Sequence, residues 1–173
     1  ENNRAIKFDL QFKNIDPNLV VVVVDQNRIS QVISNLINNS IKFISNEDRN
    51  EYADGLISIS VEKIRTVDGN NNNTNTEVII NIKDNGEGID SEIYPRLFTK
   101  FASKSFQGTG LGLFISKNII EAHGGRIWAK NNEDGKGATF SFSLPLVKQH
   151  LENSFLWLKL QSNLIENMDN NII

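Results

Sequence analysis

The spacing of the apolar residues changes along the chain from that of strands to that of helices and back, and this change constrains the fold more than any other feature of the sequence. In several short segments apolar and polar residues alternate, or apolar residues run together, which predicts strands. These strands are expected at 6–12, 19–24, 57–61, 78–82, 126–130 and 138–144. Two longer segments, 26–44 and 111–122, repeat apolar residues every three or four positions, which predicts amphipathic helices. A short helix is expected near 91–98.

Capping and turn residues mark where these elements begin and end. Asp25 stands at the expected N-cap of the first long helix, and Gly124-Gly125 follows the second as a C-terminal signal. The polar, Asn-rich segment 69–76 separates two predicted strands, so we expect a hairpin loop there. Pro145 ends the last strand, because proline has no N–H to donate to a sheet.

The order of the elements predicts an α/β fold. Strands in antiparallel runs, interrupted by helices that would pack on one face, favour a two-layer sandwich. We expect an open, mixed, mostly antiparallel sheet that is covered on one face by about three helices. Residues 1–146 form this single domain, and residues 147–173 form a tail that is either helical or disordered.

Composition excludes several classes of function. The formal net charge of −3 gives no positive field to attract nucleic acid. The sequence has no cysteine, which excludes disulfides, thiolate zinc sites and cysteine nucleophiles. No apolar run approaches the ~20 residues that span a bilayer. The absence of cysteine fits a cytoplasmic domain. The sequence starts at Glu1 without a methionine, so we expect a fragment and leave open a membrane anchor upstream.

The first long helix carries a stripe of polar side chains opposite its apolar face, because steps of three and four residues return to the same side. The stripe consists of Gln31, Asn35, Asn38, Asn39 and Lys42. A solvated helix face is one explanation. Asparagine is a poor helix former, however, so three of them in five positions cost stability that a solvated face does not require, which argues weakly against that explanation.

A glycine-rich turn follows the predicted strand 78–82, in the order Asp84-Asn85-Gly86-Glu87-Gly88. The Asp84 carboxylate can accept a hydrogen bond from an exocyclic amine such as adenine N6. Gly86 and Gly88 let the backbone approach a flat ligand closely. The alternative explanation is an ordinary tight turn.

A second glycine-rich segment, Gly108-Thr109-Gly110-Leu111-Gly112, opens the second long helix. Unpaired N–H groups and the positive end of the helix dipole at such a position favour phosphate binding. The spacing matches neither a Rossmann dinucleotide site nor a Walker-type loop, and the His-Arg-Asp and Asp-Phe-Gly motifs of kinases that act on hydroxyl groups are absent from the sequence.

The order of these motifs, followed by Gly135-x-Gly137-Ala138-Thr139-Phe140, resembles the histidine-kinase branch of the family that also includes the gyrase B proteins, the Hsp90 chaperones and the MutL mismatch-repair proteins. The resemblance covers residues 6–145. Its motifs are an N box at 28–43, a first glycine box at 84–89, an F box at 97–101 and a second glycine box at 108–113. It implies a Bergerat-type ATP-binding fold with ATP and Mg²⁺ as cofactors.

The resemblance also implies roles for individual residues. Asn39 would bind Mg²⁺, with Asn35 beside the phosphates and Lys42 paired with them, and these three would be the catalytic residues. Asp84 would bind adenine, and Thr139 would support the adenine pocket. The remaining ATP-binding residues would be Gly86, Gly88, Ile89, Gly108, Thr109, Gly110, Leu111 and Gly112.

Residues 90–107 would form a lid over the nucleotide. Phe98 and Phe101 would anchor the lid helix, and Ser103 or Lys104 would reach inward to the nucleotide. Ser40 is a departure from the family, which usually has alanine after the metal-binding asparagine.

The implied function is transfer of the γ-phosphoryl group of MgATP to a histidine on an upstream dimerisation domain, and from there to a response regulator receiver domain. The full-length protein would be a homodimer. Asn35 favours this function over hydrolysis, because hydrolytic relatives place glutamate there to activate water. A nucleotide-binding regulatory module and an ATP-clamp hydrolase are the alternatives. Neither His123, expected to cap helix carbonyls, nor His150 is the expected phosphate acceptor.

Overall fold

The computed structural model describes residues 5–16, 22–45, 54–67, 74–102 and 109–146. The elements, in chain order, are β1 (Ile6–Lys13), α1 (Gln26–Ser45), β2 (Gly55–Val67), β3 (Thr74–Asp84), the 3-10 helix η2 (Tyr94–Arg96), α2 (Gly112–Ala122), β4 (Ile127–Asn131) and β5 (Ala138–Pro145). Within these residues, no helix combines the length and the hydropathy needed to cross a membrane.

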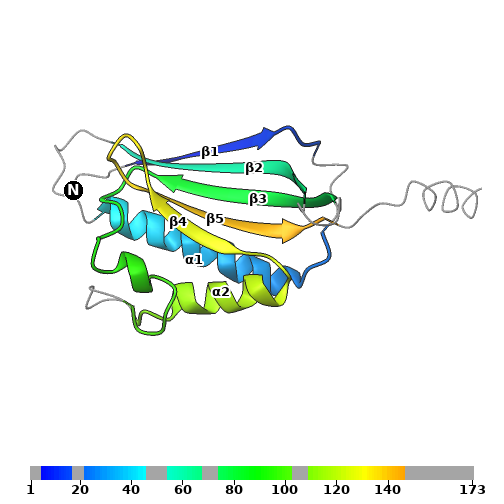
Figure 1. Ribbon diagram of the computed structural model, residues 1–173. Helices are drawn as coiled ribbons and strands as arrows, with labels where there is room; N and C mark the ends of the chain where they lie inside the picture. The colour runs from blue at the N-terminus through cyan, green and yellow to red at the C-terminus, as the bar shows by residue number, and fades with distance from the viewer. Residues whose placement is uncertain (1–4, 17–21, 46–53, 68–73, 103–108, 147–173) are drawn as a thin grey trace, which may run out of the picture.

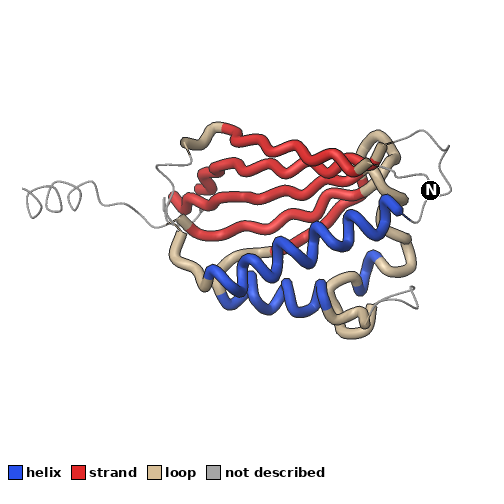
Figure 2. Tube along the Cα trace, turned by 180° about the vertical axis from the view of Figure 1, so that it is seen from behind, coloured by secondary structure: helices blue, strands red, loops and turns tan. Residues whose placement is uncertain are grey.

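The five strands form one open sheet in the order β1-β2-β3-β5-β4. β1 pairs with β2 in parallel, and the other neighbouring strands are antiparallel. Both α-helices lie on the same face of the sheet, which makes the two-layer arrangement plain from either side (Figures 1 and 2). The predicted fold class is therefore confirmed, with two α-helices and η2 as the helices of the described residues.

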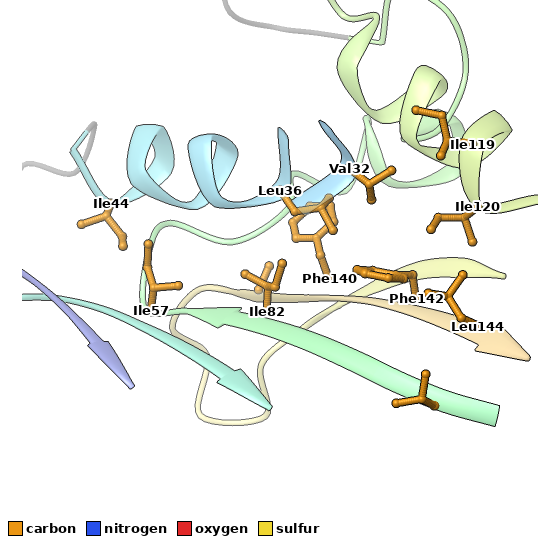
Figure 3. Packing of buried hydrophobic residues seen from close by; sticks show 12 residues of the cluster. Val32, Leu36, Ile44, Ile57, Ile82, Ile119, Ile120, Phe140, Phe142 and Leu144 are labelled. Atoms are coloured by element: carbon orange, nitrogen blue, oxygen red, sulfur yellow. The ribbon is translucent and has the colours of Figure 1, made fainter. Parts of the chain in front are cut away.

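The core lies between the helices and the sheet (Figure 3). Val32 and Leu36 of α1 and Ile120 of α2 are fully buried there. They pack with buried residues of the central strands, namely Ile57, Ile82, Phe140, Phe142 and Leu144. Each such side chain contributes about 1.5–3 kcal/mol by leaving water, so this interface holds α1 firmly against the sheet.

The start of α1 and the end of α2 are joined by two polar residues. The backbone N–H of Arg28 donates to Asp25 Oδ1 at 3.0 Å, which confirms Asp25 as the N-cap. The N–H of Asp25 donates to His123 Nε2 at 3.0 Å. His123 Nδ1 lies 2.7 Å from the carbonyl oxygen of Ile119, so the expected carbonyl capping is confirmed. These two bonds require Nδ1 to carry the proton and Nε2 to accept.

Replacing Asp25 with alanine should lower the free energy of unfolding by about 1 kcal/mol, because the Arg28 N–H loses its acceptor. Urea denaturation followed by circular dichroism measures this loss. Asp25→Ser keeps a side-chain oxygen at the N-cap and should stay close to the parent. Equal losses in the two variants would show that the cap does not contribute.

Three predicted elements differ from the structure. The strand expected at 19–24 is wrong for its described part, because Val22–Val24 are in no strand and β1 pairs directly with β2. Val22 and Val24 pack against the core while Val23 is 80% exposed. These residues therefore alternate between buried and exposed as in a strand, although they pair with no described strand. Residues 17–21 lie outside the described residues. The loop expected at 69–76 is also shorter, since β3 begins at Thr74.

The helix expected near 91–98 is only the 3-10 helix Tyr94–Arg96. Pro95 lies at its start, and it cannot donate the backbone hydrogen bond that a longer α-helix through this segment would need. The Tyr94 hydroxyl instead donates to the carbonyl oxygen of Ala129 at 2.9 Å, which ties this segment to β4. The predicted tail at 147–173 lies outside the described residues.

Candidate functional site

The polar stripe on α1 is not uniformly exposed. Gln31 and Asn38 are exposed, but Asn35, Asn39 and Lys42 are half-buried. The last three recur at steps of four and three residues, which places them on one side of the helix. The half-burial separates these three side chains from an ordinary solvated face.

Asn35 connects α1 to the start of α2. Its Nδ2 donates to the carbonyl oxygen of Gly112 at 2.9 Å and to Ser116 Oγ at 3.3 Å. A Cβ added at Gly112 would lie 3.1 Å from Asn35 Nδ2, so the absence of a side chain at Gly112 permits this close contact. Asn35 therefore holds the second glycine-rich segment against the polar side of α1.

Asp84, at the end of β3, is a buried carboxylate with well-defined partners. It is 2% exposed. Its Oδ1 accepts the N–H groups of Gly86 at 3.0 Å and Ala138 at 3.1 Å, and its Oδ2 accepts the hydroxyl of Ser40 at 3.1 Å. An ionised carboxylate offers about four acceptor sites. Among the described residues three are used, which leaves one on Oδ2 for a further donor.

Thr139 reaches Asp84 through another residue. Its hydroxyl donates to Asn132 Oδ1 at 2.7 Å, and Asn132 Nδ2 donates to the Asp84 carbonyl oxygen at 2.8 Å. Thr139 pairs with Lys83 in the sheet, whereas the neighbouring Ala138 makes the direct contact to Asp84 through its N–H. Neither Asn132 nor Ala138 was predicted as a site residue, although the Gly-x-Gly spacing just before Ala138 marked this turn as unusual.

The glycines of the first box allow close packing within the protein. A Cβ at Gly86 would lie 3.0 Å from the backbone carbon of Phe43 and 3.1 Å from Asp84 Oδ1. Beyond it, Ile89 is held by Asn131: the Ile89 N–H donates to Asn131 Oδ1 at 2.6 Å, and Asn131 Nδ2 donates to the Ile89 carbonyl at 3.0 Å. A Cβ at Gly88 would lie 3.0 Å from Asn131 Oδ1. The turn after Asp84 is thus fixed against both α1 and β4.

The second glycine box leads into α2 with an open helix end. Gly110 has a φ of +64° and approaches Phe101 so closely that a Cβ there would lie 2.7 Å from the Phe101 backbone. The Phe101 N–H donates to the Gly110 carbonyl at 3.0 Å. No side chain caps α2 at Leu111, and Thr109 is exposed. The N-terminal amides of α2 are therefore placed to receive an anion.

The predicted lid is described only in part. Phe98 packs against the core as expected. The side chain of Phe101 is 71% exposed, so its backbone, and not its ring, joins the lid to Gly110. The anchoring role predicted for the Phe101 ring is wrong in this structure. Ser103, Lys104 and Gly108 lie outside the described residues.

No cluster of three or more His, Cys, Asp and Glu side chains in the described ranges could bind a metal on its own. Asn39, half-buried beside Ser40, offers an amide oxygen, which suits a hard cation that keeps water or ligand oxygens as its other ligands. The donor set therefore fits a cation that arrives with an oxygen-rich ligand better than a self-contained metal centre.

Comparisons with known proteins show which family the chain resembles. Residues 24–148 match the family described as Histidine kinase-, DNA gyrase B-, and HSP90-like ATPase. Sensor protein FixL of Bradyrhizobium diazoefficiens is 33% identical over 150 residues, which are 87% of this chain and 26% of the relative. Sensor histidine kinase WalK of Bacillus subtilis is 32% identical over 143 residues, covering 79% of this chain and 21% of the relative.

Comparison with solved structures also finds a histidine kinase domain. The solved catalytic domain of histidine kinase ThkA superposes with a TM-score of 0.61 at 33% identity and covers 81% of this chain and 78% of that one. This chain spans about a quarter of the length of FixL and WalK, so it corresponds to one domain of such proteins. Because the family model matches residues 24–148, which is most of the chain, the chain belongs to the histidine kinase-, DNA gyrase B- and HSP90-like ATPase family.

Proposed function

We propose that this chain is the ATP-binding catalytic domain of a sensor histidine kinase, which transfers the γ-phosphoryl group of ATP to a histidine on an upstream dimerisation domain. The observation that carries the proposal is Asp84. A carboxylate that is 2% exposed and has one acceptor site left open is costly to bury, unless a ligand with an N–H donor uses that site. The exocyclic amino group of adenine is such a donor.

The phosphate groups would lie toward the start of α2. Its uncapped amides supply N–H donors, and Gly110 and Gly112 leave room for a close approach of ligand to backbone. Lys42, on the same side of α1 as Asn39, would add a positive charge to this region. Phosphoryl transfer depends mainly on such positioning and charge neutralisation.

A hard cation such as Mg²⁺ would fit this donor set. Asn39 would supply an amide oxygen, and phosphate oxygens of the nucleotide and water molecules would supply the other ligands. The bound cation would neutralise negative charge on the phosphates. The residues of this chain would do the rest, by orienting the nucleotide through Asp84 and the α2 amides.

Asn35 supports transfer to a histidine over hydrolysis of ATP. An amide cannot accept a proton, so Asn35 cannot activate a water molecule as a carboxylate would. Its Nδ2 is moreover engaged with Gly112 and Ser116. The acceptor histidine and the receiver domain of a response regulator would be partners outside this chain, in a homodimeric full-length kinase.

The direct test uses the full-length protein incubated with γ-labelled ATP and Mg²⁺. We expect protein-bound label that is acid-labile and base-stable, as phosphohistidine is, and that disappears in Asp84→Asn. Tight ATP binding without label in the protein would instead favour a regulatory module that binds nucleotide without transferring phosphate. Rapid release of labelled phosphate without protein-bound label would favour a hydrolase.

Replacing Asn39 with alanine should weaken Mg²⁺ binding in the nucleotide complex, so that the Mg²⁺ concentration for half-maximal autophosphorylation rises at least about tenfold. ATP binding measured without Mg²⁺ should change much less. Asn38→Ala is the matched control, because it removes the same side chain from the neighbouring, exposed position. Unchanged Mg²⁺ dependence in Asn39→Ala would contradict the assignment of the metal ligand.

A further inference from the structure

Ser40 occupies an unusual position for a helical serine. It lies in α1 and is fully buried, so solvent cannot satisfy its hydroxyl. Serine hydroxyls inside helices often donate to a carbonyl of the preceding turn. The Ser40 hydroxyl instead donates across the core to Asp84 Oδ2 at 3.1 Å, joining α1 to the end of β3 over 44 residues of sequence.

This bond completes the restraint of the Asp84 carboxylate. The two backbone N–H groups of Gly86 and Ala138 hold Oδ1 from one side, and the Ser40 hydroxyl holds Oδ2 from another. With three donors in place, the carboxylate cannot turn without breaking a buried hydrogen bond. Its remaining acceptor site therefore has a fixed direction.

We propose that Ser40 is a positioning residue for base selection: it orients Asp84 so that the free acceptor site of Oδ2 meets the amino group at purine position 6, and so strengthens the preference for adenine nucleotides. The inference deepens the proposed function and rests on it. A purine with hydrogen at position 6 cannot use this acceptor site, and a purine with a carbonyl oxygen there would set two acceptors against each other.

The test measures nucleotide affinity by calorimetry for the parent and for Ser40→Ala, with two probes. ATP carries the 6-amino group, and purine riboside 5′-triphosphate has hydrogen in its place. We expect the dissociation constant for ATP to rise about three- to tenfold in Ser40→Ala, because the acceptor is no longer held in line. The dissociation constant for the purine riboside nucleotide should stay within about twofold of the parent value. The preference for ATP over this nucleotide should therefore fall by nearly the same factor by which ATP binding weakens.

Ser143→Ala is the matched control. Ser143 is also fully buried, and its hydroxyl accepts the N–H of Arg126 at 3.2 Å, on β5 away from Asp84. Its removal should leave the preference for ATP over the purine riboside nucleotide unchanged. In an Asp84→Asn background, Ser40→Ala should not reduce that preference further, because the acceptor that Ser40 orients has already gone.

Other outcomes overturn the inference in distinguishable ways. If Ser40→Ala weakens both nucleotides equally, the serine acts through general packing and not through base selection. If it changes neither constant while the parent prefers ATP, the positioning role is wrong and the proposed function stands. If the parent binds both nucleotides equally well, or neither, then the role of Asp84 in the proposed function is overturned as well.

Discussion

We expect Asp84→Asn to weaken ATP binding about ten- to hundredfold while the domain stays folded. A hydrogen bond to a charged group is worth about 1.5–3 kcal/mol, and every 1.4 kcal/mol corresponds to a factor of ten in affinity. The amide oxygen of asparagine can still accept the N–H groups of Gly86 and Ala138, which preserves the turn. The loss should therefore appear in binding and not in folding.

The expected loss of ATP affinity arises at Oδ2 of Asp84. In the parent, Oδ2 accepts from Ser40 and keeps one site open. In the variant an NH₂ group takes the place of Oδ2, so it presents donors to the Ser40 hydroxyl and to the amino group of adenine. The Ser40 hydroxyl can rotate to accept, but the amino group of the base cannot.

Calorimetric titration with ATP measures the effect, and thermal unfolding checks the fold. Asp134→Asn is the matched control, because it makes the same change of charge in the nearby β4–β5 turn, where Asp134 is exposed. The Lys136 N–H donates to Asp134 Oδ1 and lowers the pKa of that carboxyl, a local bond that asparagine can also form. An unchanged dissociation constant in Asp84→Asn, or an equal loss in Asp134→Asn, would refute the role of Asp84.

The local spacing of apolar residues predicted most of the helices and strands, because that spacing sets which face of each element can be buried. The apolar residues of α1 repeat at helical spacing over its whole length, and the helix spans Gln26–Ser45 as that repeat requires. The run ending at Val24 was misleading, since a strand also depends on an available neighbour. β1 pairs in parallel with β2, and the sequence of either strand alone does not reveal this pairing.

The same distinction explains which site residues were predicted. Helical spacing predicted the polar stripe of α1, and its place at a strand end marked Asp84 as a candidate ligand residue. The choice of Asn35, Asn39 and Lys42 within the stripe came from the family resemblance. Ser40, Asn132 and Ala138 contact Asp84 from 44, 48 and 54 residues away. The sequence marks Ser40 and the turn before Ala138 as unusual, but only the folded arrangement brings these residues to Asp84.

Gly137→Ala should be the most destabilising of these substitutions, lowering the free energy of unfolding by about 2–5 kcal/mol. The residue has a φ of +74°, which costs a side-chain-bearing residue about 1–2 kcal/mol. A Cβ there would also overlap the carbonyl oxygen of Asp84 and lie 2.6 Å from its Oδ1. Relieving that overlap in a packed site adds about 1–3 kcal/mol.

Gly135→Ala separates the two contributions. Gly135 belongs to the same turn and has nearly the same backbone angle, a φ of +72°, but a Cβ there would meet nothing within 4 Å. It should therefore lose only the cost of the backbone conformation, about 1–2 kcal/mol. Urea denaturation of both variants gives the difference in stability directly.

We also expect folded Gly137→Ala to bind ATP more weakly than folded Gly135→Ala, because the overlap displaces the Asp84 carboxylate. Equal stability in the two variants would mean that the turn moves away from Asp84 freely, and the carboxylate would then be held less rigidly than its hydrogen bonds imply.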